Sequence, residues 1–257
     1  MNRVEPKILF EDNHLLVAEK PVNLPSQADE SGDPDFLSVL KEDIKERYQK
    51  PGQVYLGLVH RLDRPVGGIM VFAKTSKAAS RLSAQIRNGE FKKTYLAVLY
   101  GTPPVSQGTL RHFLLKDSRM NKVAVVDSPE AGSKEAVLDY EIVSVHDQMA
   151  LARINLHTGR SHQIRVQFAA IGHPLYGDQK YGPAYSKPGQ QIALWSTQIC
   201  CKHPTKNEAV VFLSIPPCKH PWSLFDLNTI AQGLGVHAHG FEKNDDEKQG
   251  SRGHGDI

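Results

Sequence analysis

Residues 60–68 read HRLDRPVGG and are followed directly by the apolar run IMVFA at 69–73. A polar segment that ends in two glycines and leads into β-branched and aromatic residues predicts a loop that enters a buried strand. Asp63 lies in this loop between Arg61 and Arg64, and we expect the nearby positive charge to hold its carboxylate ionised. An ionised, positioned aspartate can act as a nucleophile or a general base. The alternative is an ion pair that closes the loop.

The chain before and just after this junction alternates short strands with two helices. ILFEDNHLLVA (8–18) predicts two strands around an Asp-Asn turn, and apolar residues at helical spacing predict a helix over about 35–48. Ser76 stands where an N-cap belongs, so a second helix should run from there to Gly89. TYLAVLY (94–100) is rich in β-formers and predicts another strand.

Further along, strands are expected near 109–115, 122–126, 136–145, 149–156, 192–195 and 209–215, with a helix from Ser161 to just before Gly172. Many strands with few helices predict an α+β domain with a mixed, mainly antiparallel sheet. We expect this domain to span 1–234. Residues 235–257 are polar and nearly free of apolar side chains, so we expect a disordered tail there.

Composition excludes some classes of protein. The 257 residues are 40% hydrophobic and 23% charged, without an apolar run long enough for a membrane span and without the features of a secretory signal. Three cysteines in such a chain are expected to be reduced thiols, which favours the cytoplasm. A net charge of +3 permits nucleic-acid binding without requiring it.

The second segment that carries chemistry is LHTGRSHQIR (156–165). Gly159 would allow a tight turn before a helix, where free N–H groups and Arg160 suit a phosphate. Arg165 would lie one turn into the helix, from where its guanidinium could reach a buried carboxylate. The alternative is a capped surface helix with solvated arginines.

The third segment is KKTYLAV (92–98), in which Tyr95 begins a strand beside two lysines. Its ring could stack on an exposed base. A strand tyrosine taken alone is more often a core residue.

Together these segments resemble the RluA-type family of RNA pseudouridine synthases. HRLD with GGIMVFAKT, then KKTYLAV, then LHTGRSHQIR resemble its successive signature motifs, and GHPLYGDQKYG (172–182) and DNHLLVAEKPVNLPSQ (12–27) resemble two further ones. The resemblance covers about residues 8 to 217. It implies an isomerase that needs no cofactor or metal, acts on ribosomal or transfer RNA, works as a monomer, and has a bifurcated, largely antiparallel sheet with flanking helices and loops.

The resemblance also implies roles for individual residues. Asp63 would be the catalytic aspartate, Tyr95 the tyrosine that stacks on the target base and takes part in proton removal at C5, and Arg165 the partner of Asp63. Arg61 would help fill the gap left by the flipped nucleotide. The RNA-binding side chains are expected to be Arg61, Arg64, Lys92, Lys93, Arg160 and His162.

Two positions depart from the family's pattern. Gly67 stands where serine is frequent, which predicts a looser loop. Asn23 stands where glycine is usual, and asparagine tolerates positive φ better than most residues, so the turn should survive.

Three other interpretations compete. A non-catalytic RNA-binding protein could keep the same fold, although intact Asp63, Tyr95 and Arg165 argue against it. A hydrolase lacks a Ser-His-Asp or paired-carboxylate arrangement. A zinc site is disfavoured because the candidate ligands have no recognised spacing; they are Cys200, Cys201, His203, Cys218 and His220.

Overall fold

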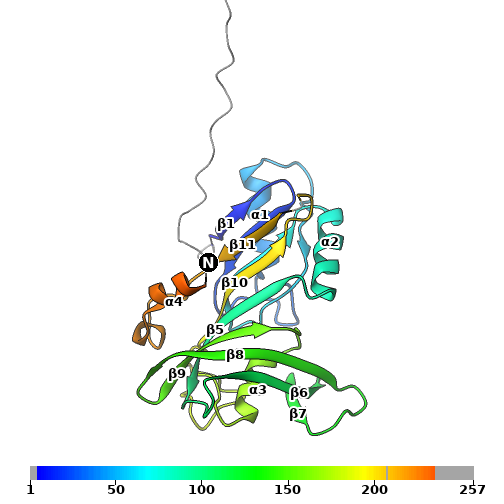
Figure 1. Ribbon diagram of the computed structural model, residues 1–257. Helices are drawn as coiled ribbons and strands as arrows, with labels where there is room; N and C mark the ends of the chain where they lie inside the picture. Colours follow the sequence, from blue (N-terminus) through cyan, green and yellow to red (C-terminus); the bar gives the residue numbers. More distant parts are fainter. Residues whose placement is uncertain (1–4, 207, 235–257) are drawn as a thin grey trace, which may run out of the picture.

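The computed structural model describes residues 5–206 and 208–234, and the expected tail at 235–257 lies outside them (Figure 1). The described residues form an eleven-stranded sheet. Its strands are β1 Lys7–Glu11, β2 Leu15–Lys20, β3 Gly57–Leu58, β4 Gly67–Ala73, β5 Lys92–Tyr100, β6 Gln107–Asp117, β7 Lys122–Val126, β8 Lys134–His146, β9 Met149–Leu156, β10 Leu194–Lys202 and β11 Ala209–Leu213.

The sheet confirms the predicted architecture. All strand pairs are antiparallel except β4 with β10. The sheet divides at β10, because Trp195 and Ser196 pair with β4 on the edge opposite β5, whereas Gln198–Lys202 pairs with β11. The fold is therefore α+β with a mixed, branched and mainly antiparallel sheet.

The strand β10 is much longer than the predicted segment 192–195. Its middle residues, Ser196 and Thr197, are polar but fully buried. Ser196 pairs with β4 and β5, and the Thr197 carbonyl accepts from the Ser214 N–H at 2.8 Å, so the strand continues where the apolar pattern stops.

The helices are α1 Phe36–Arg47, α2 Ser76–Arg87, α3 Gln163–Ala170 and α4 Leu227–Gly233, with a short 3₁₀ helix at Trp222–Leu224. The predicted N-cap of α2 and the predicted start of α3 are wrong, although α2 does begin at Ser76. The N-cap of α2 is Thr75, whose side chain accepts from the N–H of Ala78. α3 starts at Gln163, two residues after Ser161, because His162 is left-handed with φ 53° and cannot belong to the helix.

The central strands are buried on both faces, which explains their continuous apolar sequence. Met70 and Phe72 of β4 face the core that contains α1, whereas Ile69 and Val71 face α2. In β5 the same alternation puts Tyr95 in the α1 core. Leu62 of the Asp63 loop and Ile164 of α3 share that core, so the three predicted segments meet on one side of the sheet.

Figure 1 shows α2 beside the part of the sheet with β10 and β11, and α3 beside the β6–β9 part. After β11, residues such as Trp222 and Phe225 pack against the opposite face of β5. Within the described residues, every helix is too short or too polar to cross a bilayer.

Candidate active site

The backbone of the Asp63 loop is held by two side chains, one from the end of β2 and one from the turn after it. The Ser26 hydroxyl donates to the Leu62 carbonyl at 2.7 Å and accepts from the Leu62 N–H at 3.1 Å. The Lys20 ammonium donates to the Arg64 carbonyl at 3.1 Å. These contacts bracket Asp63 on both sides and leave its side chain 28% exposed.

Lys20 is an unusual residue because it is fully buried. Besides the Arg64 carbonyl, its ammonium donates to the carbonyls of Pro21 and Leu24 at 2.9 and 2.7 Å. Burial lowers the pKa of Lys20 to about 7, although the negative charge of Asp63 acts in the opposite direction. The loop therefore rests on an amine that titrates near neutral pH.

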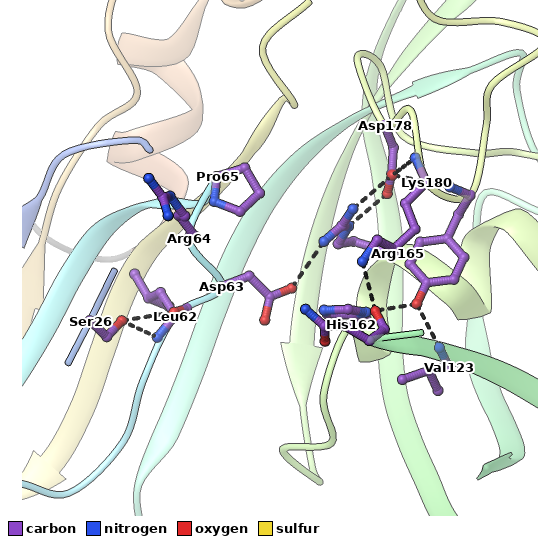
Figure 2. A network of polar contacts seen from close by, with 12 residues as sticks. Ser26, Leu62, Asp63, Arg64, Pro65, Val123, His162, Arg165, Asp178 and Lys180 are labelled. Atoms are coloured by element: carbon purple, nitrogen blue, oxygen red, sulfur yellow. Dashed lines mark hydrogen bonds and ion pairs between the residues drawn. The ribbon is translucent and has the colours of Figure 1, made fainter. Parts of the chain in front are cut away.

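Arg165 connects Asp63 to a second carboxylate. Its Nε and Nη2 donate to the two oxygens of Asp178 at 2.7 and 2.8 Å, and its Nη1 reaches Asp63 at 3.4 Å. Figure 2 shows Asp63 extending toward Arg165, with Asp178 on the far side of the guanidinium. Burial acts to lower the pKa of Arg165, but Asp178 and Asp63 outweigh it and raise the pKa.

Asp178 is itself anchored. Its side chain has no solvent exposure and also accepts from the N–H groups of Lys180 and Tyr181, at 3.0 and 3.2 Å. A buried carboxylate with four donors stays in place, so it fixes the guanidinium before any substrate arrives.

The aromatic ring of Tyr181 lies next to the Arg165–Asp178 pair. The Tyr181 ring stacks with the Arg165 guanidinium at 5.2 Å. Its hydroxyl accepts from the Val123 N–H at 2.9 Å and lies 2.7 Å from Nδ1 of His162. Burial lowers the pKa of His162, and the cationic Arg165 adds to this while Asp63 opposes it. His162 is therefore neutral at pH 7 and serves as a hydrogen-bonding group.

Tyr95 is buried, with 6% of its surface exposed. Burial raises the pKa of its phenol, and the negative charge of Asp63 raises it further. Tyr95 is therefore protonated at neutral pH.

Two adjoining clefts open around Asp63, with volumes of about 520 and 460 Å³. Together they bring all nine predicted site residues to one place, since each lines at least one cleft. Asp63 is the sole carboxylate among the described residues of the first cleft. Its cations are Arg61, Arg87, Lys92, Lys93, Arg160 and Arg165.

The predicted RNA-binding side chains differ in their freedom. Arg64 forms an exposed ion pair with Asp33, and the Nε of Arg160 donates to the Glu135 carbonyl at 2.8 Å. Lys93 is half-buried, and burial lowers its pKa. Its ammonium has no hydrogen bond or ion pair among the described residues. A lysine without an anion beside it is free to meet one that a ligand brings.

His162, Gly159 and Gly67 differ from what the sequence predicts for the backbone, whereas Asn23 agrees with it. His162, and not Gly159, takes the left-handed conformation. A Cβ at Gly159 would lie 3.2 Å from the Lys93 ammonium, so glycine there gives Lys93 room. A Cβ at Gly67 would lie 2.3 Å from Cζ3 of Trp195, so this position is tightly packed and the predicted looseness is wrong. Asn23 does adopt positive φ, at 65°.

Sequence reasoning missed several residues of the site. No site residue is predicted in the GHPLYGDQKYG motif, yet its Asp178 and Tyr181 hold Arg165 and His162. A lysine in Glu-Lys-Pro gives no local sign that it will be buried, so Lys20 was missed as well. The pairing of Arg165 with a carboxylate was foreseen, but the closer partner is Asp178.

One of the zinc candidates, His203, is engaged by other groups. Nε2 of His203 lies 2.8 Å from Asp12, and its Nδ1 accepts from the N–H groups of Thr205 and Lys206. Both ring nitrogens are therefore occupied, and the described residues contain no cluster of three or more metal-ligating side chains.

Comparison with known proteins agrees with this picture. A sequence profile described as RNA pseudouridylate synthase matches residues 14–170. An uncharacterized RNA pseudouridine synthase, YhcT of Bacillus subtilis, is 35% identical over 210 residues, which are 80% of this chain and 67% of that protein. Ribosomal large subunit pseudouridine synthase D of Pseudomonas aeruginosa is 35% identical over 193 residues, 72% of this chain and 56% of that one.

Among solved structures, human RNA pseudouridylate synthase domain containing 1 has a TM-score of 0.69 at 24% identity and covers 91% of this chain and 96% of its own, so the two share a fold. The chain belongs to the RNA pseudouridylate synthase family, and it is an isomerase of the RluA type, as its motifs predict.

Proposed function

We propose that this protein converts a uridine within structured RNA into pseudouridine, with Asp63 as the essential carboxylate. The observation that carries the proposal is the first cleft, where a partly exposed Asp63 contacts a pre-fixed Arg165 and the other charged side chains are cationic. A polyanion is attracted to such a cleft, and its one carboxylate is then left beside the reacting nucleotide.

The reaction breaks the N1–C1′ bond, turns the uracil and joins C5 to C1′. A proton leaves C5 and one is taken up at N1, so atoms and electrons balance without a redox partner. Asp63 can attack the sugar, attack the base or assist the departure of uracilate. All three routes need an ionised carboxylate at the reacting centre.

Tyr95 and Arg165 take the roles that the resemblance implies. Arg165 contacts Asp63 at 3.4 Å and holds its carboxylate at the reacting centre. Tyr95 stacks on the target base and takes part in proton removal at C5.

A stacked uridine has to be extruded before it can react, at a cost of a few kcal/mol. The two clefts give it a destination of about 520 Å³ with an adjoining one of about 460 Å³. Phosphate contacts offset part of the cost. The side chains proposed to supply these contacts are Arg61, Arg64, Lys92, Lys93, Arg160 and His162.

Ribosomal RNA is the favoured substrate and transfer RNA the second. The support is the name of the Pseudomonas aeruginosa relative, which refers to the large ribosomal subunit. We propose that the protein acts as a monomer, and that it acts in the cytoplasm because its cysteines are free.

Mapping pseudouridine across the RNA of cells that lack the gene tests the proposal. A site that disappears and returns with the wild-type protein, but not with Asp63→Ala or Asp63→Asn, supports it. Binding of the same RNA by both variants should persist. Restoration by Asp63→Ala would refute the role of Asp63, and an unchanged map would favour a non-catalytic RNA-binding protein.

A further inference from the structure

The four carbonyl groups of residues 62–65 in the Asp63 loop are each engaged by a different donor. Leu62 is held by Ser26 and Arg64 by Lys20, as described above, and the Asp63 carbonyl accepts from the Val66 N–H at 3.0 Å. The Pro65 carbonyl accepts from Nε2 of Gln191 at 2.7 Å. This last donor comes from the segment that leads into β10, on the far side of the site.

Gln191 also touches the side of the site that holds Arg165. Its carbonyl oxygen would lie 2.2 Å from a Cβ at Gly177, so only a glycine with φ 75° allows the two backbones to meet there. Gly177 precedes Asp178, the bidentate partner of Arg165. The side chain of Gln191 thus holds the Asp63 loop while its backbone packs against the residue before Asp178.

The orientation of Gln191 is set by Asn23. The Asn23 amide donates to Oε1 of Gln191 at 2.9 Å, which directs the Gln191 amide nitrogen toward Pro65. The resemblance places glycine at position 23, and glycine would have no side chain for this bond. Asn23 keeps the positive φ of the turn, at 65°, and adds the contact.

We propose that Gln191, oriented by Asn23, is a positioning residue that sets the separation between Asp63 and the Arg165–Asp178 pair. The proposal rests on the proposed function of Asp63. Asp63 lies 3.4 Å from Arg165, so a small displacement of its loop converts this contact into a tight ion pair or breaks it. A displacement of about 1 Å in a catalytic group can lower the rate about 100-fold.

The expected signature separates positioning from stability. Gln191 is half-buried, and one hydrogen bond from such an amide adds little net stability. Gln191→Met has nearly the same size but cannot donate to Pro65. Asn23→Gly retains the turn and removes the amide alone. Gln179→Met is the matched control, because Gln179 is exposed on the same connection and its amide lies against Gln190, away from the Asp63 loop.

The experiment uses the full chain with RNA labelled with tritium at uracil C5, taken from cells that lack the gene. Release of tritium with enzyme in excess gives the maximal rate constant and the half-saturating enzyme concentration. For Gln191→Met we expect the maximal rate constant to fall about 10-fold or more, within the range that misplaced catalytic groups produce. Asn23→Gly should cause a smaller loss in the same direction. Half-saturation should stay unchanged, and the melting temperature should move by no more than about 4 °C.

Two results would overturn the inference: a maximal rate constant equal to that of Gln179→Met, or a loss accompanied by an equal rise in half-saturation or by a large drop in melting temperature. Wild-type protein that releases no tritium from any RNA would instead refute the proposed function. The two failures are therefore distinguishable.

Discussion

Arg165 and Asp178 form a buried bidentate pair, with N–O distances of 2.7 and 2.8 Å and no solvent exposure of the carboxylate. Asp63 shares the same guanidinium at 3.4 Å. The strong pair is thus the structural one, and Asp63 keeps a loose contact. A carboxylate that has to leave its partner to reach a substrate can do so more easily when the contact is loose.

Removing Arg165 from the buried pair should strongly lower the free energy of unfolding. Arg165→Met leaves Asp178 charged and buried without its guanidinium, and we expect a loss of about 3–5 kcal/mol in the free energy of unfolding. Adding Asp178→Asn removes the stranded charge and retains an oxygen for the N–H groups of Lys180 and Tyr181. The double variant should therefore recover stability but remain inactive, as measured by urea unfolding and tritium release.

An exposed pair provides the comparison. Asp33→Asn breaks the Arg64–Asp33 ion pair, whose side chains are 44% and 49% exposed, and should cost far less stability than Arg165→Met. An active double variant, or equal losses for the buried and exposed pairs, would contradict this assignment of roles.

Tyr95→Phe tests the hydroxyl of the buried tyrosine. The ring can still pack and stack, so RNA binding should be retained. Because the hydroxyl is proposed to take part in proton removal at C5, we expect a slower maximal rate with a larger kinetic isotope effect when the C5 hydrogen is deuterium. Rates and isotope effects equal to those of the wild type would limit Tyr95 to packing.

Lys93→Gln tests the half-buried lysine of the first cleft. If its ammonium meets one phosphate, its removal should reduce the slope of log affinity against log salt by about 0.7–0.9. Lys219→Gln, an exposed residue that lies on neither cleft, should leave the slope unchanged. Equal slopes for wild type and Lys93→Gln in filter binding would place the phosphate elsewhere.

The sequence predicted the fold well where the burial pattern follows the apolar pattern. β4 is apolar throughout because both of its faces are buried. Prediction from the sequence failed where tertiary contacts override local preference. Ser196 and Thr197 are polar yet buried in β10. The local sequence also does not predict that His162 is left-handed, which delays the start of α3.

The site could be predicted in its parts but not in its connections. Asp63, Tyr95 and Arg165 stand in motifs that can be read locally, and the structure gathers them in one cleft. The short bonds from Arg165 to Asp178, and from Gln191 to Pro65, join residues 13 and 126 positions apart. Such contacts depend on how loops meet, which spacing along one chain does not specify.

Lys20 makes the stability of the protein depend on pH near neutrality. Burial lowers its pKa to about 7 in the folded chain, against an ordinary value near 10.4 when unfolded. Between these values the unfolded chain binds one more proton than the folded chain, so the free energy of unfolding rises with pH, by up to about 1.4 kcal/mol per unit. Below pH 7 both states are protonated and this rise is absent.

Lys20→Met removes the titration. Asp63 and Arg64, the charged groups that act on Lys20, are present in both proteins, so the difference between the two stability curves isolates Lys20. From pH 7 to pH 9 the wild type should gain about 2 kcal/mol relative to Lys20→Met. Urea unfolding at half-unit steps of pH measures the difference. Parallel curves would mean that Lys20 stays protonated, held in that form by the carbonyls of Pro21, Leu24 and Arg64.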